Sequence, residues 1–219
     1  MKEPMSSQPD SSPRARSTYR HGDLRRALLD AGVELARAGG PEAVVLREAT
    51  RRAGVVPNAA YRHFASRLAL LQAVRAAALS AVARAMEEEL AGADAAGGPL
   101  ARARASVRAV GTGYLRFAQA ETGLFRTAFA TPVDLDDAPG ELKGGTSGLN
   151  PFELLGAALD RLVAAGGMPP ERRPGAEFLA WSAVHGLALL IIDGPLRGLP
   201  APQTEALGQR LLDMIEKGL

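Results

Sequence analysis

The feature that most constrains the fold of this 219-residue chain is the recurrence of apolar residues at helical spacing between clusters of glycine and proline. In the first such segment, Leu24, Leu28, Ala31 and Leu35 are spaced so that they share one face of an α-helix. Gly39-Gly40-Pro41 ends this segment, as glycine followed by proline is expected to do. No segment alternates apolar and polar residues between hairpin turns. The pattern therefore predicts an all-α fold.

The same reasoning predicts eight further helices, each bounded by glycine, proline or a capping residue. They are expected over 46–53, 57–64, 67–90, 100–121, 124–130, 150–165, 176–193 and 204–217. Ser66 and Asn150 are the predicted N-terminal caps of two of them, because a side-chain oxygen can accept a free backbone N–H there. Residues 131–148 contain Pro132, Pro139 and four glycines, and are predicted to form a long loop.

Composition excludes several classes of protein. The chain has no cysteine, which rules out a disulfide scaffold, a zinc finger and a thiol nucleophile. No secretory signal is visible after Met1, and no histidine spacing suits a metal. The longest nearly apolar run, 178–192, is shorter than the roughly 20 residues that a membrane span needs. We expect a cytoplasmic protein that contacts no membrane and carries no metal or cofactor.

Charge is distributed unevenly along the chain. Residues 1–75 carry 13 basic and 7 acidic side chains, whereas residues 76–219 carry 13 and 17. Residues 1–18 are rich in serine and proline, with almost no apolar side chain to bury, and are expected to form a disordered basic arm. A basic first third joined to an acidic remainder indicates that the N-terminal part meets a polyanion.

Residues 46–64 have the pattern of a helix-turn-helix. Gly54-Val55-Val56 separates two short helical segments, and Pro57 can begin the second because the first helical position needs no N–H. The residues expected to lock the two helices together are Leu46, Ala53, Val55, Ala60 and Phe64. In such a unit the second helix enters the major groove of DNA while the first crosses the backbone. The pattern favours DNA recognition.

Three short motifs stand in order between Tyr19 and Leu71. They are Ala-Gly-Val at 53–55, Tyr-x-His-Phe at 61–64, and Ser66-Arg67 at the start of the following helix. In this order and spacing the segment resembles the N-terminal domain of TetR-type transcriptional regulators. The resemblance implies a DNA-binding domain over 19–66 and a helical ligand-binding and dimerisation domain over 67–219.

The resemblance also implies which residues contact DNA. They are Arg47, Thr50, Pro57, Asn58, Ala59, Tyr61, Arg62, His63 and Arg67. Tyr61, His63 and Arg67 match positions that usually hold phosphates, and Arg47 and Thr50 lie on the helix whose N-terminus usually faces one. Asn58 and Arg62 are the candidates for base edges, because asparagine can pair with adenine and arginine with guanine. Arg14 and Arg16 of the basic arm, and Arg20 just after it, can enter the minor groove. The alternative for Tyr61 is a core aromatic, and for His63 a surface histidine.

Three positions depart from the family pattern. Val56 and Val45 stand where capping hydroxyl residues are usual, and the missing cap at Val56 costs about 1 kcal/mol unless water or phosphate replaces it. Thr50 replaces a usual alanine, and its hydroxyl is expected to bond back to the carbonyl of Leu46. These substitutions leave the fold plausible but alter its local hydrogen bonds.

The C-terminal two thirds contain a second, shorter resemblance. Trp181 to Ala188 resembles a ligand-binding domain of TetR-type regulators that is characterised by Trp, His and Gly at this spacing. The expected pocket residues are Tyr114, Phe117, Trp181 and His185, with ordinary core packing as the alternative. Arg116 is expected to pair with an acidic ligand or to face solvent. Gly186, inside a helix, suggests close approach by another helix.

The last two predicted helices, 176–193 and 204–217, form the dimer interface in the family. A two-fold dimer also suits a palindromic operator, since one short helix reads few bases. We therefore expect a homodimeric regulator of transcription, a repressor that a small apolar or amphipathic ligand releases from a palindromic operator. No catalytic residue is expected.

Two other functions remain open at this stage. An all-helical enzyme would use His185 with Tyr114 or Asp193, although the chain has only three histidines. A nonspecific nucleoid-type protein would bind DNA with a steep salt dependence and little sequence preference. Substitution of Tyr61 and His63 separates these classes, because it should abolish DNA binding without affecting the fold or any catalysis.

Overall fold

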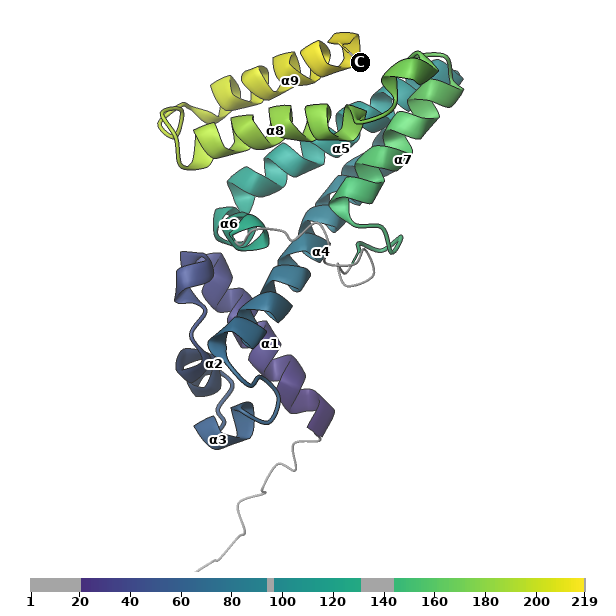
Figure 1. Ribbon diagram of the computed structural model, residues 1–219. Coiled ribbons are helices and arrows are strands. Elements are labelled where there is room, and N and C mark those ends of the chain that lie inside the picture. Colours follow the sequence, from purple (N-terminus) through teal and green to yellow (C-terminus); the bar gives the residue numbers. More distant parts are fainter. Residues whose placement is uncertain (1–20, 94–96, 131–143, 219) are drawn as a thin grey trace, which may run out of the picture.

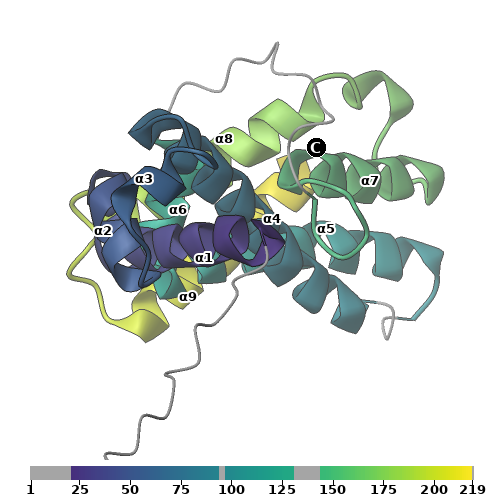
Figure 2. The same cartoon turned by 90° about the horizontal axis from the view of Figure 1, so that it is seen from below.

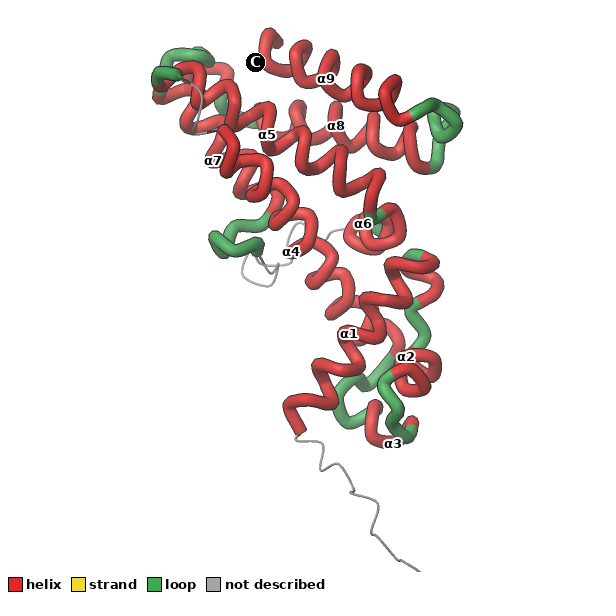
Figure 3. The backbone as a smooth tube through the Cα atoms, turned by 180° about the vertical axis from the view of Figure 1, so that it is seen from behind, coloured by secondary structure: helices red, strands yellow, loops and turns green. Residues whose placement is uncertain are grey.

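The structure is a computed structural model that describes residues 21–93, 97–130 and 144–218. Helices and turns make up this described part, which contains no β-strand, so the predicted all-α fold is confirmed (Figure 3). The α-helices within these ranges are α1 His21–Gly39, α2 Leu46–Arg52, α3 Pro57–Ala60, α4 Arg67–Ala93, α5 Pro99–Ala120, α6 Thr122–Phe129, α7 Pro151–Ala164, α8 Ala176–Ile192 and α9 Ala201–Gly218. The expected arm and most of the expected loop lie outside the described residues, and so do Arg14, Arg16 and Arg20.

Helices α1 to α3 form a small unit at one end of the molecule (Figure 1). Its core contains Leu28 and Leu35 from α1, Leu46 from α2, and Ala60 and Phe64 from the α3 region, all buried. The other two predicted locking residues, Ala53 and Val55, are half-buried and pack against this core. The set of residues expected to hold α2 and α3 together is therefore confirmed.

Helix α3 is shorter than the predicted segment 57–64. It ends at Ala60 and is followed by a turn, in which the N–H groups of His63 and Phe64 both donate to the Ala60 carbonyl, at 2.9 Å each. This pair of bonds closes the last turn and directs the ring of Phe64 into the core. Val56 provides no side-chain cap at the other end of the helix, as its missing hydroxyl predicts.

The hydroxyl of Thr50 has a different hydrogen-bond acceptor from the one predicted. It donates to the carbonyl of Arg47 at 2.6 Å rather than to that of Leu46. The prediction was wrong by one residue, because a threonine hydroxyl on a helix can reach the carbonyl either three or four positions back. Thr50 is buried, so this bond satisfies a hydroxyl that has lost its water.

Helix α4 runs from the small N-terminal unit to the far end of the molecule (Figure 1). Ser66 caps it as predicted, with its hydroxyl oxygen accepting the N–H of Ala69 at 3.1 Å. Helix α8, which contains the run 178–192, is too short to cross a membrane, as predicted; among the described residues it is α4 that is long and apolar enough by length and composition. In this fold it is instead the central packing helix, in contact with α1, α5, α6 and α7.

The remaining helices form a larger bundle around the second half of α4. Helices α5, α7, α8 and α9 pack together, as the view from below shows (Figure 2). Helices α4 and α5 approach closely at Gly113, where an added Cβ would lie 2.6 Å from the carbonyl oxygen of Ala85. Asn150 caps α7 as predicted, in a reciprocal capping box with Glu153.

Candidate functional site

The turn between α2 and α3 sets the position of α3. Gly54 has a φ of +68°, a left-handed conformation that glycine adopts without strain. The turn is closed by hydrogen bonds from the N–H of Gly54 to the Arg51 carbonyl, at 3.3 Å, and from that of Val55 to the Thr50 carbonyl, at 3.0 Å. As a result α3 lies at the outer end of the molecule, far from α8 and α9 (Figure 1).

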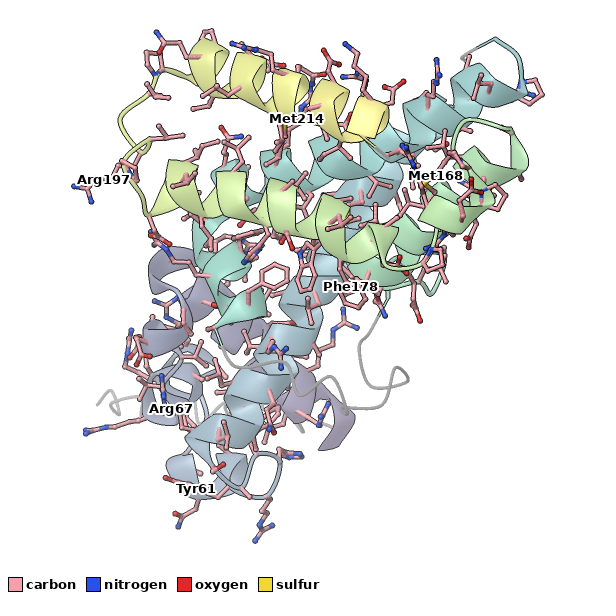
Figure 4. All side chains as sticks on the ribbon, turned by 45° about the horizontal axis from the view of Figure 1, so that its top comes forward. Tyr61, Arg67, Met168, Phe178, Arg197 and Met214 are labelled. Carbon is pink, nitrogen blue, oxygen red and sulfur yellow. The ribbon has the colours of Figure 1, made fainter. Side chains whose placement is uncertain are left out.

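The outer surface of α3 is polar and accessible. Asn58, Tyr61 and Arg62 are exposed, with 58% of Tyr61 accessible to solvent, while Ala59 and His63 are half-buried. Tyr61 lies at the extreme tip of the molecule (Figure 4). An amide, a phenol and a guanidinium thus form one exposed group of hydrogen-bonding side chains, which suits base edges and phosphates. Pro57 begins the helix at this surface.

Arg47 and Thr50, the predicted contact residues on α2, lie in different environments. Arg47 is exposed in the first turn of α2, whereas Thr50 is buried with its hydroxyl bonded to the Arg47 carbonyl. Arg51 and Arg52, at the other end of α2, both donate to the carboxylate of Glu48. Hydrogen bonds from Arg51 and then from Arg52 lower the pKa of Glu48 to about 2. The positive charge of Arg51 and Arg52 is therefore partly neutralised within the helix.

Arg67 joins the start of α4 to the turn before α2. Its Nε donates to the Val44 carbonyl at 2.8 Å and its Nη2 to the Pro41 carbonyl at 2.9 Å. Nη2 also lies 3.3 Å from a carboxylate oxygen of Glu42. The guanidinium, predicted to hold a phosphate, is thus engaged within the protein, where it fixes α4 relative to the helix-turn-helix.

A cavity of about 330 Å³ lies inside the larger bundle. Its wall is almost entirely apolar and comes from helices throughout the C-terminal part. The lining residues include Arg75, Leu79 and Met86 from α4, Val107, Val110 and Tyr114 from α5, Phe129 from α6, Phe152 and Leu155 from α7, Phe178, Trp181 and Val184 from α8, and Leu212 and Ile215 from α9. This volume is at the small end of the roughly 300–1,000 Å³ that ligand pockets occupy.

Three of the four predicted pocket residues form one hydrogen-bonded cluster. The indole Nε1 of Trp181 donates to the Tyr114 hydroxyl at 3.2 Å, and this hydroxyl lies 2.7 Å from Nδ1 of His185. Burial raises the pKa of Tyr114 and lowers that of His185, so both side chains are neutral at pH 7. Tyr114 and Trp181 line the cavity, whereas His185 lies behind Tyr114.

Phe117 and Arg116, also considered as pocket residues, do not line the cavity. Phe117 is buried on α5 but is not among the residues that line the cavity, because it lies a turn of helix beyond Tyr114. Arg116 forms ion pairs with Glu89 and, at 3.7 Å, with Glu205. It is therefore a surface residue and not a partner for a ligand in this cavity.

Arg75 is a polar cavity residue that the sequence analysis missed. Its Nε donates to the carbonyl of Ala128 at 3.0 Å, near the end of α6. Its Nη2 is buried and has no hydrogen-bond partner among the described residues. From sequence alone, an arginine on a helix is expected to face solvent. Only the packing of α4 against α6 shows that Arg75 lines the cavity.

An apolar stripe runs along the outer side of α8. Phe178, Leu179, Leu189 and Leu190 are exposed, and Met214 on the neighbouring α9 is exposed as well. Gly186 lies on the same side of α8, and beyond its own helix no atom of the described residues lies within 4 Å of where its Cβ would be. The predicted close approach of another helix at Gly186 is therefore absent within the described part of this chain.

Two family models match the chain. The model of bacterial regulatory proteins of the tetR family matches residues 28–74, which contain α2, α3 and most of α1. A second model, described as "Tetracyclin repressor-like, C-terminal domain", matches residues 107–215, which include most of the cavity wall. No curated protein sequence matches the chain.

Solved structures share the architecture over nearly the whole chain. A protein of unknown function from Rhodococcus sp. RHA1 is 26% identical, with a TM-score of 0.73 over 93% of this chain and 99% of that one. The TetR family transcriptional regulator PfmR from Thermus thermophilus is 22% identical, with a TM-score of 0.54 over 88% and 98%. A tetR family regulator described as putative, from Shewanella sp. PV-4, is 15% identical, with a TM-score of 0.58 over 87% and 97%. The last two similarities concern the fold alone.

Proposed function

The chain belongs to the TetR family of DNA-binding transcriptional regulators, and from this premise we propose that it is a homodimeric repressor released from its operator by a small apolar or amphipathic ligand. Members of this family are not enzymes, so the Tyr114–His185 pair has no catalytic role. One observation carries the proposal. A single continuous helix, α4, connects an exposed polar reading surface at the tip to an apolar cavity in the bundle.

The DNA-reading part of the proposal uses the exposed tip within the domain 19–66. Asn58 and Arg62 contact base edges in the major groove, and Tyr61 and His63 contact phosphates. Arg47, Pro57 and Ala59 complete the surface that meets the backbone. Thr50 and Arg67 have a positioning role instead, because their polar groups are already bonded within the protein.

The dimer part of the proposal uses the apolar stripe of α8 with α9. Leu179, Gly186 and Leu190 follow one another at helical spacing on that side, and a glycine with open space above it lets a partner helix approach closely. Exposed leucines of this kind mark an interface when they are contiguous. A second copy of this chain, related by a two-fold axis, is the occupant that a palindromic operator requires.

The release part of the proposal uses α4, within the ligand-binding and dimerisation domain 67–219. Its first turns pack on α1, where Leu70 and Val74 lie beside Gly32, and its later turns supply Arg75, Leu79 and Met86 to the cavity wall. A ligand that favours another tilt of α4 changes the separation of the two α3 helices in the dimer. Ligand affinity and DNA affinity are then reciprocally coupled.

The type of C-terminal domain is part of the same proposal. Trp181, His185 and Gly186 carry the Trp-His-Gly pattern, and the hydrogen bonds of the first two to Tyr114 supply a structural reason for the spacing. We place the protein in the cytoplasm, where its operator DNA lies.

Selection of duplexes from a random pool by the purified protein tests this function. We expect enrichment of an inverted repeat whose half-sites lie about 34–36 Å apart, or a multiple of this distance. The variant Tyr61→Ala, which alters only an exposed side chain, is the control and should enrich nothing. Binding of all duplexes alike, with a steep salt dependence, would instead indicate a nonspecific nucleoid-type protein.

A further inference from the structure

The wall of the cavity leaves few polar groups for a ligand. Most lining residues are aliphatic or aromatic, and the polar exceptions are Arg75, Tyr114, Asn150, Glu153 and the indole N–H of Trp181. An apolar tail in this cavity needs no polar partner, so the polar part of a ligand must meet one of these five groups.

Most of these polar groups already have partners within the protein. Trp181 donates to the Tyr114 hydroxyl, which also bonds to His185. The side-chain oxygen of Asn150 accepts the N–H groups of Phe152 and Glu153, and Glu153 accepts the N–H of Asn150 at 2.8 Å. The capping box therefore holds both side chains at the start of α7.

Arg75 is different, because part of its guanidinium has lost water without gaining a partner. Only Nε is bonded, to the carbonyl of Ala128, while Nη2 is the single buried side-chain polar atom without a hydrogen bond in the described part of the chain. No carboxylate of the described residues lies within ion-pair distance of Arg75. Arg75 as a whole is half-buried, but a guanidinium nitrogen that has lost its water without gaining a partner is unfavourable unless an anion completes its hydrogen bonds.

Among the described residues that line the wall, Glu153 carries the one other charge, and it does not offset Arg75. Its carboxylate bonds at the N-terminus of α7, where the helix dipole favours negative charge. The charge of Glu153 is thus already offset by an N–H donor and the helix dipole, whereas Nη2 of Arg75 has no partner among the described residues and can donate to a ligand anion. The two-pronged shape of the guanidinium suits the two oxygens of a carboxylate.

We propose that the ligand of this cavity is an amphipathic carboxylate, whose head group pairs with Arg75 while its apolar tail fills the remaining space. This inference rests on the proposed ligand-controlled function and names the chemical class of the ligand. The cavity of about 330 Å³ leaves room for an apolar tail beside the head group. Arg75 is then the residue that determines specificity for the head group.

Titration of the protein with octanoate, 1-octanol and octylamine tests the proposal, because these probes share a tail and differ in head-group charge. Trp181 is the only tryptophan of the chain and lines the cavity, so its fluorescence reports binding directly. We expect octanoate to bind about tenfold to a hundredfold more tightly than 1-octanol, the range typical of a charge-assisted hydrogen bond. Octylamine should bind most weakly.

Three variants show whether Arg75 causes this preference. Arg75→Gln should reduce the ratio of octanoate to 1-octanol affinity to about one, and Arg75→Lys should restore part of it because the charge is kept. Arg84→Gln is the matched control, since it removes the same charge from an exposed position on α4 and should leave the ratio unchanged. Comparable affinity of each variant for 1-octanol shows that its cavity is intact.

The proposal is overturned if 1-octanol or octylamine binds as tightly as octanoate, or if the preference survives in Arg75→Gln. Failure of all three probes to bind would overturn it too. None of these outcomes concerns the operator, which is measured separately by selection of duplexes. A failure of the ligand inference is therefore distinguishable from a failure of the DNA-binding proposal.

Discussion

Individual side chains at the tip of the molecule have distinct roles in the proposed reading of DNA. Asn58, Tyr61 and Arg62 project from α3, while Ala60 and Phe64 of the same segment are buried and hold it in place. The exposed residues contribute little to stability because most of each side chain is in solvent and has little packing to lose. Their substitution should therefore affect binding and leave folding unchanged.

Arg62 and Arg47 should differ in whether their contribution to DNA affinity depends on the base sequence. Arg62→Ala is expected to weaken operator binding by about 1–3 kcal/mol and to relax the preference at one base position, because a guanidinium reads a guanine edge. Arg47→Ala should weaken binding to all duplexes alike and reduce the slope of log affinity against log salt by about one. Fluorescence anisotropy on the selected operator and its single-base variants measures both effects. An equal loss on every duplex for Arg62→Ala would contradict its assignment to a base edge.

His185 should make stability depend on pH in a defined window. Burial lowers the pKa of His185 below its usual 6.5, so the unfolded chain takes up a proton at a higher pH than the folded protein does. Neutral His185 therefore contributes fully to the free energy of unfolding above pH 6.5, and this contribution declines as the pH falls below 6.5. Carboxylates with a lowered pKa, such as Glu87, lose their contribution only in a more acidic range.

Urea unfolding at about pH 7.5 and pH 5.5 measures this effect. From the higher to the lower pH, the free energy of unfolding should fall more for the wild-type protein than for His185→Gln, because glutamine does not titrate. The same decrease in both proteins would show that His185 is not the group responsible.

At the scale of elements, α6 is the short helix that joins the N-terminal unit to the bundle. Its first turn packs directly on the end of α1, and its last turn supplies Phe129 to the cavity and the Ala128 carbonyl to Arg75. Ion pairs connect Arg37 of α1 to Glu121, just before α6, and Arg126 of α6 to Asp193, just after α8. These exposed pairs orient the helices more than they stabilise them.

Gly123 permits the contact between α6 and α1. A Cβ at this position would lie 2.3 Å from the carbonyl oxygen of Ala36 and 2.4 Å from that of Arg37. Gly123→Ala should therefore lower the free energy of unfolding by about 1–3 kcal/mol, because backbone atoms must move. Gly92→Ala is the control, since no atom of another described residue beyond its own helix lies within 4 Å of the added Cβ, and the helix gains up to about 1 kcal/mol. Equal stability of the two variants in urea unfolding would contradict the close packing of α6 on α1.

At the scale of the whole molecule, the reading surface and the proposed dimer surface lie at opposite ends of the chain's fold (Figure 1). The cavity lies between them, against the same α4 that packs on the N-terminal unit. In a two-fold dimer formed through α8 and α9, a change in the tilt of α4 therefore acts on both α3 helices at once.

Leu190→Glu should disrupt this dimer. Leu190 is 43% exposed, so the folded monomer tolerates the charge, whereas burial of an unpaired carboxylate in an interface is costly. Sedimentation analysis should show a monomer, with a loss of affinity for the palindrome. Leu68→Glu, at a leucine of α4 that is 56% exposed outside the stripe, should remain dimeric. A dimer of unchanged stability in Leu190→Glu would exclude this face.

The sequence by itself determined the all-α fold, the helix-turn-helix, and the caps at Ser66 and Asn150. Each of these depends on residues within a few positions of one another, because helical hydrogen bonds and capping bonds are local. All helix ends but that of α3 agree with the predicted ranges to within three residues. Tyr114 and Trp181, which the sequence suggested as pocket residues, both line the cavity.

Only the tertiary structure decided which polar groups are free and which are engaged. The partners of Arg67 and Arg75 are separated from them by 23 and 53 positions in the chain, so no local pattern predicts them. The position of Phe117 outside the cavity and the open space above Gly186 likewise depend on how distant helices pack. A helix pattern fixes which residues share a face, but the neighbours of that face are fixed by the packing of the whole chain.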